Sequence, residues 1–293
     1  MKPAPFAYHR PESLEEALAL LAEHGDDARL IAGGQSLVPM MNFRLVAPEH
    51  LIDLGRVGGL DGIGEAEGAL VVGARVRHAD LAASPLVRER CPLVSAAAET
   101  IGHWAIRLQG TIGGSLAHAD PAAQLPLVAA TLDAEIEAAG PAGRRRIAAA
   151  DFFEALMTTA LAPEEILTAV RFPVRRPGQG WSFEMRARRV GDFALVAVAA
   201  VLTVADGHIA AARVGIGGVG DVPAVPDAVA GALVGRPATV EASATAADAA
   251  RSAVEPMGDP RVPVEFRRDL VQALTRRAVL AAIARATESG TEA

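Results

Sequence analysis

Two stretches of the sequence place a glycine pair beside small hydroxyl residues. The first, "AGGQSL", covers residues 32–37, and the second, "TIGGSL", covers residues 111–116. Glycine lets another group approach the main chain closely, and successive N–H groups in such a turn can converge on an anion. Ser36, Thr111 and Ser115 add hydroxyl donors beside those amides. One such turn suits a phosphate, and two facing turns would suit a pyrophosphate.

Neither stretch matches a common nucleotide-binding loop. Both lack the G-x-G-x-x-G fingerprint and the G-x-x-x-x-G-K-[ST] loop, and neither contains a lysine. The missing lysine argues against a nucleoside triphosphate with its magnesium ion. A diphosphate held by uncharged donors favours a permanently bound dinucleotide, whereas one glycine pair alone is more often a tight turn.

The rest of the sequence offers little redox or acid–base chemistry of its own. The only cysteine, Cys91, can close no disulfide within the chain and cannot hold an iron–sulfur cluster, so it is predicted to pack in the core. The seven histidines show no H-E-x-x-H spacing, and the pair His118 and Asp120 is weak evidence for a metal. We therefore predict no metal site and no catalytic residue. Redox chemistry must come from an organic cofactor or from another subunit.

Composition sets the class of protein. The 293 residues are 51% hydrophobic, which is enough for two compact domains. The net charge of −7 excludes a general attraction to nucleic acid, and the basic clusters at 143–147 and 186–189 are too short to form such a surface. No apolar run reaches the roughly 18 residues of a membrane span, and the first residues lack a signal-peptide pattern. These features predict a cytoplasmic protein without an integral membrane segment.

The elements that position the two glycine pairs can be predicted from local patterns. Ser13 and Glu16 form a capping box that opens an alanine- and leucine-rich helix, which ends near Gly25. Residues 28–34 read as a strand that runs into the first glycine pair, and residues 86–102 as a helical stretch that leads toward the second. Further strands are predicted at 50–54, 68–74, 134–140 and 164–173, and further helices at 76–84, 124–133 and 150–156.

A domain boundary is predicted at residues 173–180, where proline, glycine and arginine cluster. Long strands follow, with Asp206-Gly207 as a hairpin turn, and residues 226–288 are mostly helical.

A resemblance to a known family extends this interpretation. The segments "AGGQSLVPMMNFRL", "IRLQGTIGGSLAHADPAAQLP" and "RRVGDFALVAVAAVL" resemble the FAD-binding medium subunit of molybdenum hydroxylases. This is the carbon monoxide dehydrogenase medium-subunit type, which is also similar to the flavin domain of xanthine dehydrogenase. The likeness covers nearly the whole chain, and the combination of both loops with the GDFA segment is highly specific.

The resemblance implies an α+β fold. A two-subdomain FAD-binding fold of the two-loop (PCMH) type would span 1–55 and 56–175, followed by a C-terminal domain of antiparallel sheet plus helices at 176–293. The implied FAD-binding residues come from the two loops, from two apolar positions and from one position where the family generally has an acidic residue. They are Ala32, Gly33, Gly34, Gln35, Ser36, Leu37, Ile101, Thr111, Gly113, Gly114, Ser115, Gln124 and Leu167.

One position departs from the family, and a second varies among its members. At Gln124 the acidic residue is replaced, so a hydrogen bond to a cofactor hydroxyl would lose its charge assistance, at a cost of about 1 kcal/mol. Phe193 stands where some relatives carry tyrosine, and its hydrophobic ring would either pack near the isoalloxazine or belong to the core of a strand.

The function implied by the resemblance is electron transfer through FAD. Electrons would come from a molybdenum cofactor on a large partner subunit, by way of [2Fe-2S] clusters on a small partner subunit, and leave for an external acceptor. The expected assembly is a dimer of heterotrimers. Two alternatives stay open: a stand-alone FAD-dependent oxidase or dehydrogenase of the same superfamily, and an assembly subunit without a cofactor.

Overall fold

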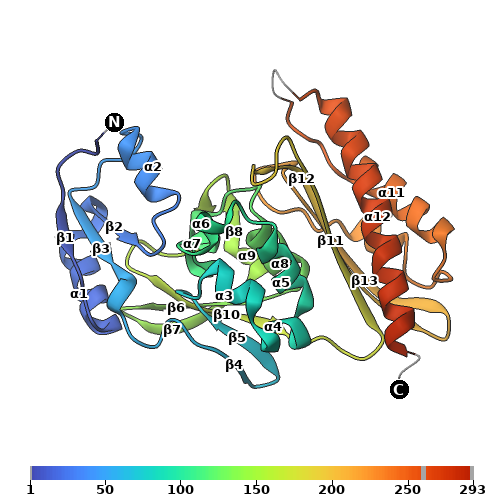
Figure 1. Ribbon diagram of the computed structural model, residues 1–293, viewed down its shortest axis with the longest axis horizontal. Helices are drawn as coiled ribbons and strands as arrows, with labels where there is room; N and C mark the ends of the chain where they lie inside the picture. The colour runs from blue at the N-terminus through green and yellow to red at the C-terminus, as the bar shows by residue number, and fades with distance from the viewer. Residues whose placement is uncertain (1, 259–261, 291–293) are drawn as a thin grey trace.

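The computed structural model describes residues 2–258 and 262–290 of the chain. Three parts follow one another along its longest axis (Figure 1). The predicted C-terminal domain at 176–293 includes residues 259–261 and 291–293, which lie outside the described residues. No helix in the described part of the chain is both long enough and apolar enough to cross a membrane.

The N-terminal part is a small parallel sheet with the strand order β1-β3-β2. One half of the predicted capping box is present, because Ser13 Oγ accepts the Glu16 N–H at 3.1 Å. The return bond differs, since the Glu16 carboxylate accepts the N–H of Glu12, one residue before the cap, at 2.8 Å. Ala17 and Leu21 are four residues apart on the first helix and are buried with Ile52. These residues belong to a hydrophobic core that is separate from those of the other two parts. The elements are β1 (Ala7–His9), α1 (Leu14–His24), the 3₁₀ turn η1 (Gly25–Asp27), β2 (Ala28–Ile31), α2 (Leu37–Asn42), β3 (His50–Asp53) and the 3₁₀ turn η2 (Leu54–Arg56).

The central part is a five-stranded antiparallel sheet, ordered β4-β5-β10-β6-β7, with helices packed against it. Its strands are β4 (Ile63–Ala66), β5 (Ala69–Gly73), β6 (Glu135–Gly140), β7 (Gly143–Ala148) and β10 (Ile166–Pro173). A two-stranded hairpin is formed by β8 (Phe153–Ala155) and β9 (Thr158–Thr159). The helices are α3 (His78–Ala83), α4 (Pro85–Arg90), α5 (Pro92–Glu99), α6 (Trp104–Arg107), α7 (Ile112–His118), α8 (Gln124–Thr131) and α9 (Ala149–Phe152).

Two local predictions in this part need correction. The helix predicted at 150–156 ends at Phe152, because the chain turns at Met157, whose φ is +53°, and residues 153–155 pair with β9. The helical stretch predicted at 86–102 is divided at Cys91, because Pro92 starts a new helix at its first position. Cys91 itself is buried, as predicted, and burial raises the pKa of its thiol to about 12.

The C-terminal part is an antiparallel sheet whose central strand is buried on both faces. Ala197, Ala199 and Val201 join the core of the central part, whereas the alternate residues Val196 and Val198 pack in the C-terminal core. This two-sided burial explains the uninterrupted apolar run of that strand. The elements are β11 (Gln179–Ala187), β12 (Ala194–Ala205), β13 (His208–Gly217), α10 (Asp227–Gly231), α11 (Val240–Ala253) and α12 (Val264–Gly290).

The predicted hairpin and the contact between the parts are both well defined. Asp206 and Gly207, with φ of +50° and +73°, form the turn between β12 and β13.

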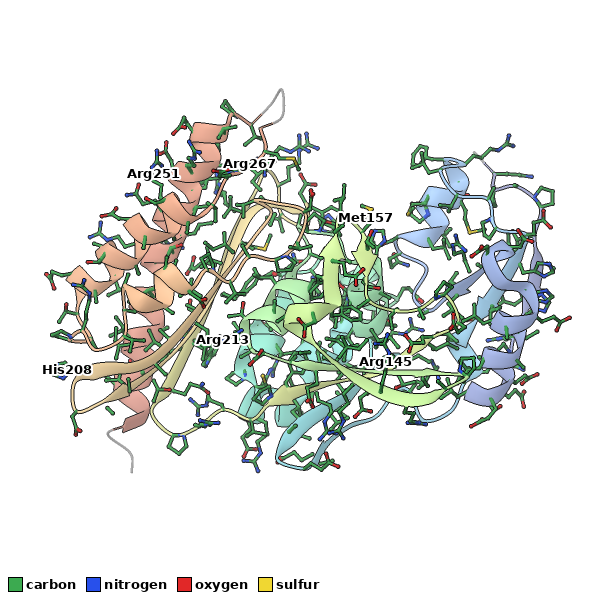
Figure 2. All side chains as sticks on the ribbon, turned by 180° about the vertical axis from the view of Figure 1, so that it is seen from behind. Arg145, Met157, His208, Arg213, Arg251 and Arg267 are labelled. Carbon is green, nitrogen blue, oxygen red and sulfur yellow. The ribbon has the colours of Figure 1, made fainter. Side chains whose placement is uncertain are left out.

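Arg213 of β13 lies at the junction with the central part, as Figure 2 shows, and donates to the carbonyls of Ala130 and Thr131 at 3.0 and 2.9 Å. These are the last carbonyls of α8, which have no partner within their helix. The α+β class predicted from the sequence is confirmed.

Candidate cofactor-binding site

The first glycine loop joins β2 to α2 and leaves its amides available. Gly34 takes φ of +69°, a left-handed conformation that favours glycine. The N–H groups of Gly33, Gly34 and Gln35 donate to no other atom among residues 2–258 and 262–290. The Gln35 side chain folds back and donates to the Gly33 carbonyl at 3.0 Å. The loop therefore offers consecutive uncharged donors to an anion.

The second glycine loop differs from the expectation of a second set of free amides. Thr111 is the N-cap of α7, and its Oγ1 accepts the Gly114 N–H at 3.1 Å. The Ile112 and Gly113 N–H groups donate to the carbonyls of Val76 and Ala74 at 3.1 and 2.9 Å. These bonds anchor the start of α7 on the segment that follows β5. The N–H groups of residues 112–115 therefore all have acceptors within the chain, since that of Ser115 donates to the Thr111 carbonyl at 3.0 Å.

The structure brings the two loops into direct contact. A Cβ atom on Gly33 would meet the carbonyl oxygen of Gln109 and would lie 2.8 Å from the Cα of Gly110. Arg77 donates a hydrogen bond to that same Gln109 carbonyl and holds it in place. Figure 1 shows the connection from β2 to α2 facing α6 and α7 across this junction. Residues about 75 positions apart in the sequence therefore form one site, as a bridging diphosphate requires.

The predicted loop residues divide by exposure. In the second loop, Gly114 is exposed and Ser115 is half-buried, whereas Thr111 and Gly113 are buried, so their contact with a cofactor stays a prediction. A Cβ on Gly113 would lie 2.6 Å from the Ala74 side chain, so its role is close packing. The first loop is more open: Gln35 is exposed, and the other five predicted residues are half-buried, namely Ala32, Gly33, Gly34, Ser36 and Leu37.

The three predicted residues outside the loops take different positions. Ile101 is half-buried at a turn where Arg107 donates to the Ile101 and Gly102 carbonyls at 2.8 and 3.1 Å. Leu167 is buried in the core on β10. Gln124 is the first residue of α8, is buried, and donates to the Met185 sulfur at 3.7 Å. The role of all three at the cofactor stays a prediction.

Phe193 does not lie in the core of a strand. It is 63% exposed in the loop between β11 and β12, so the alternative of a core aromatic is wrong. In the same loop Gly191, with φ of +85°, packs so closely on His103 that a Cβ would lie 2.6 Å from the imidazole ring. The exposed Phe193 and the exposed Trp104, which follows His103, therefore belong to two segments in contact. Exposed aromatic side chains on adjoining segments are typical of binding surfaces.

His78 was not predicted from the sequence, but it packs against Gly110, next to the second loop. Its ring is buried, and a Cβ on Gly110 would lie 2.8 Å from it. Neither ring nitrogen makes a hydrogen bond of normal geometry. Burial, followed by the charges of Arg77 and Arg107, lowers the pKa of His78 to about 4, and only the backbone of Thr111 opposes this shift. No sequence pattern marks a single histidine in a helical stretch as such a support.

We expect His78 to make the protein sensitive to mild acid. The folded pKa lies below the unfolded value of about 6.5, so the stability contributed by the neutral ring is complete above that value and is lost as the pH falls toward 4. At pH 5 the loss amounts to about 2 kcal/mol. Urea unfolding of wild type and His78→Leu between pH 7.5 and 4.5 measures it. The control is His208→Gln. If the stability of His78→Leu depends on pH in the same way as that of wild type or of this control, the assignment is refuted.

The cofactor loops are distinct from a polar cavity of about 640 Å³ at the junction of the first two parts. Residues 12–15 and 58–60 line one side of this cavity, and Glu137 and Arg171 line the other. None of the thirteen predicted cofactor residues contributes to its walls. The close approach of the two glycine loops, rather than the size of a cavity, therefore identifies the candidate site.

Comparison with known proteins identifies the family of the chain. Residues 4–175 match the model of the family described as "FAD binding domain in molybdopterin dehydrogenase", and residues 181–282 match "CO dehydrogenase flavoprotein C-terminal domain". The chain is 39% identical to the carbon monoxide dehydrogenase medium chain of Afipia carboxidovorans, covering 98% of this chain and 99% of the relative. It is 41% identical to the nicotine 6-hydroxylase medium subunit of Paenarthrobacter nicotinovorans, covering 97% and 100%. A chain of the solved carbon monoxide dehydrogenase from Hydrogenophaga pseudoflava superposes with a TM-score of 0.94 at 38% identity, covering 97% of this chain and 99% of that chain.

Proposed function

Because this chain belongs to the family of FAD-binding medium subunits of molybdenum hydroxylases, we propose that it carries electrons through a bound FAD between partner subunits and an external acceptor. The electrons come from iron–sulfur clusters on a small partner subunit, which receives them from a molybdenum cofactor on a large one. The protein is thus one part of a heteromeric oxidoreductase.

The contact between the two glycine loops is the observation that carries the proposal. The free amides of Gly33, Gly34 and Gln35 would donate to the diphosphate of FAD, and Ser36 and Ser115 would add hydroxyl donors. Because Gly33 touches the backbone at Gln109 and Gly110, the main chains approach as closely as a group bridging both loops needs. These residues fit a dinucleotide held by neutral groups.

The chain's own residues bind, orient and exclude water. When bound, the flavin supplies the redox chemistry, since it can accept and release electrons one at a time. Thr111 and Gly113 fix the second loop on the sheet, and His78 fills the space beneath it. Arg107 holds the turn that carries Ile101, one of the apolar positions proposed to face the cofactor. Leu167 and Gln124 are proposed as the other contacts outside the loops.

The finer features of the assembly belong to the same proposal. We expect a dimer of heterotrimers located in the cytoplasm, with 1–55 and 56–175 as the two FAD-binding subdomains and 176–293 as the C-terminal domain. The exposed Trp104 and Phe193, on two segments in contact, support a partner surface near the cofactor. Phe193 supplies an apolar ring there and no hydroxyl.

Purification of the full chain, alone and with its partner subunits, tests the proposal. The chain alone is expected to bind one FAD and to leave it oxidised when substrates of the complex are added, because the proposed site of their oxidation is on the large subunit. The complete complex is expected to bleach the flavin absorbance on addition of substrate. Substrate-dependent bleaching by the chain alone would favour a stand-alone oxidase. A colourless chain that still binds its partners would favour an assembly subunit.

A further inference from the structure

Three histidines from separate elements meet on the N-terminal part. His9 ends β1, His24 ends α1, and His50 begins β3. Their nearest ring nitrogens all lie within 4.8 Å of one another, and each side chain is half-buried. The His24 and His50 rings stack with centroids 3.7 Å apart, and His9 Nε2 lies 2.9 Å from His50 Nδ1. No metal site was predicted from these three histidines, because they are scattered along the chain.

The fold explains why these positions converge. In the parallel pair of β1 and β3, His50 of β3 is opposite Ala7 of β1. His9 is two residues after Ala7 on β1. Side chains two residues apart on a strand share a face, so His9 and His50 are diagonal neighbours on one face of the sheet. The last residue of α1 reaches the same place, because the chain turns there through η1 into β2, whose Ala28 is also paired with His50.

The chemistry of the donors selects one class of ligand. Imidazole nitrogen suits borderline divalent ions such as Zn²⁺, Cu²⁺ and Ni²⁺, whereas Mg²⁺ and Ca²⁺ prefer oxygen. Three histidines are sufficient for a zinc site with an open position. Bonds of about 2.05 Å in a tetrahedron place ligand nitrogens about 3.3 Å apart. One pair of ring nitrogens is 2.9 Å apart and the set lies within 4.8 Å, so the three rings are near enough to reach one ion once their side chains adjust.

We propose that His9, His24 and His50 bind one borderline divalent metal ion, for which Zn²⁺ is the probe. The fourth position is left to water or to a small anion. The site is separate from the FAD site, because His50 lies at the start of β3 while the glycine loop follows the end of the neighbouring strand, about 10 Å away along the sheet. Metal binding therefore joins β1, α1 and β3 without touching the cofactor, and it stabilises the folded chain by mass action.

Calorimetric titration of the full-length chain with ZnCl₂ tests this site. The chain must carry no polyhistidine tag and must be stripped of metal beforehand. We expect one Zn²⁺ per chain, and the replacements His24→Ala and His50→Ala are expected to weaken binding at least about tenfold, because loss of an outer-shell partner alone costs that much. The matched control is His208→Ala, since His208 is exposed on the hairpin and its imidazole hydrogen-bonds to the Asp206 carbonyl of its own turn.

Two further measurements keep the result decisive. Thermal unfolding without metal checks that each variant is folded, and His24→Gln replaces any alanine variant that is not. Co²⁺ titration of wild type is expected to give absorption bands of a low-coordinate site that excess Zn²⁺ removes. Absence of Zn²⁺ binding at 100-fold excess over protein, or equal loss of binding in His208→Ala, overturns the proposal. FAD content is expected to be the same in all folded variants, which separates this result from the proposed function.

Discussion

Gly33→Ala is expected to weaken FAD binding by roughly 100-fold. The added methyl group would collide with two backbone groups, the Gln109 carbonyl and the Gly110 Cα, and neither can move like a side-chain end. Arg77 holds the Gln109 carbonyl, and the amides that follow it are anchored on Val76 and Ala74, so the second loop cannot withdraw cheaply. Adding a methyl group to a packed contact costs up to about 3 kcal/mol. If this cost falls on the bound state, it corresponds to a loss of roughly 100-fold in affinity for FAD.

Titration of the cofactor-free chain with FAD, followed by flavin fluorescence, measures this effect. Gly58→Ala is the matched control, because a Cβ at Gly58 would meet nothing within 4 Å and its φ is not positive. The control is expected to bind FAD like wild type. If Gly33→Ala binds FAD as tightly as the control, the contact between the loops has no part in holding the cofactor.

The sequence predicted the first glycine loop better than the second. The local pattern predicts a strand that runs into Gly33 and Gly34, and the structure has that strand end at Ile31 and, within the described part of the chain, leaves their amides free. The amides of the second loop donate to Val76 and Ala74, carbonyls more than 35 residues earlier in the chain. No local pattern records such a pairing. Local chemistry therefore identified the residue types, whereas tertiary packing decided which of them remain available.

Buried charges and clusters were harder to predict for the same reason. Nothing in the sequence separates His78 from an exposed helical histidine, and His9, His24 and His50 converge only because β1 and β3 pair in parallel. Arg171 left a clearer signal. A single charged residue within the apolar run "ILTAVRFP" must find partners if that strand is buried, and β10 is the centre of its sheet.

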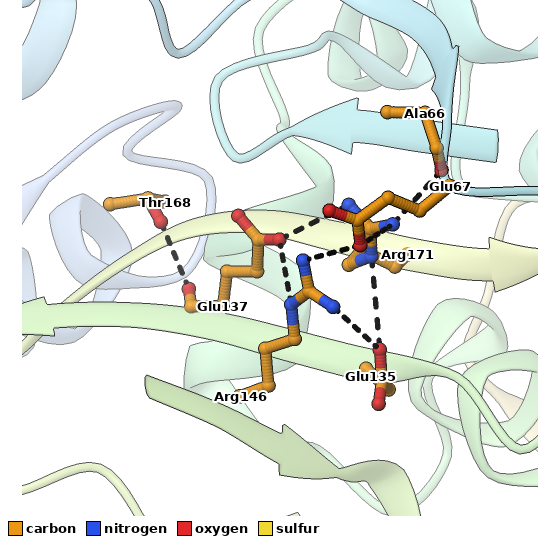
Figure 3. Close-up of polar contacts among 7 residues, drawn as sticks. All are labelled: Ala66, Glu67, Glu135, Glu137, Arg146, Thr168 and Arg171. Atoms are coloured by element: carbon orange, nitrogen blue, oxygen red, sulfur yellow. Dashed lines mark hydrogen bonds and ion pairs between the residues drawn. The ribbon is translucent and has the colours of Figure 1, made fainter. Parts of the chain in front are cut away.

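The partners of Arg171 form the charged network shown in Figure 3. Arg171 is 6% exposed and donates to the Ala66 carbonyl at 2.9 Å and to the Glu67 carboxylate at 3.1 Å. It also approaches Glu137 at 3.3 Å and Glu135 at 3.7 Å. Arg146 of β7 contacts the same three carboxylates from the neighbouring edge, but it is 43% exposed. Two arginines thus share one set of acids and differ mainly in burial.

This difference predicts unequal effects on stability. Arg171→Met is expected to lower the free energy of unfolding by about 3 kcal/mol, because it leaves the Ala66 carbonyl and the acids without their buried partner. Arg146→Met is expected to cost under about 1 kcal/mol, since water screens and replaces an exposed ion pair. Methionine keeps the apolar stem in both variants. Urea unfolding at pH 7 measures both, and equal losses would show that burial does not govern the network.

The pH dependence of the same network gives an independent check. The hydrogen bond and charge of Arg146, followed by the charge of Arg171, hold the pKa of Glu67 below its ordinary value. A carboxylate with a lowered folded pKa contributes stability above its unfolded pKa of about 4.3, and this stability is lost as the pH falls through the folded value. The difference between wild type and Arg171→Met is therefore expected to shrink below about pH 4.3, as Glu67 becomes protonated. A difference that stayed constant down to pH 3 would mean that Arg171 acts through the Ala66 carbonyl and packing, rather than through its acidic partners.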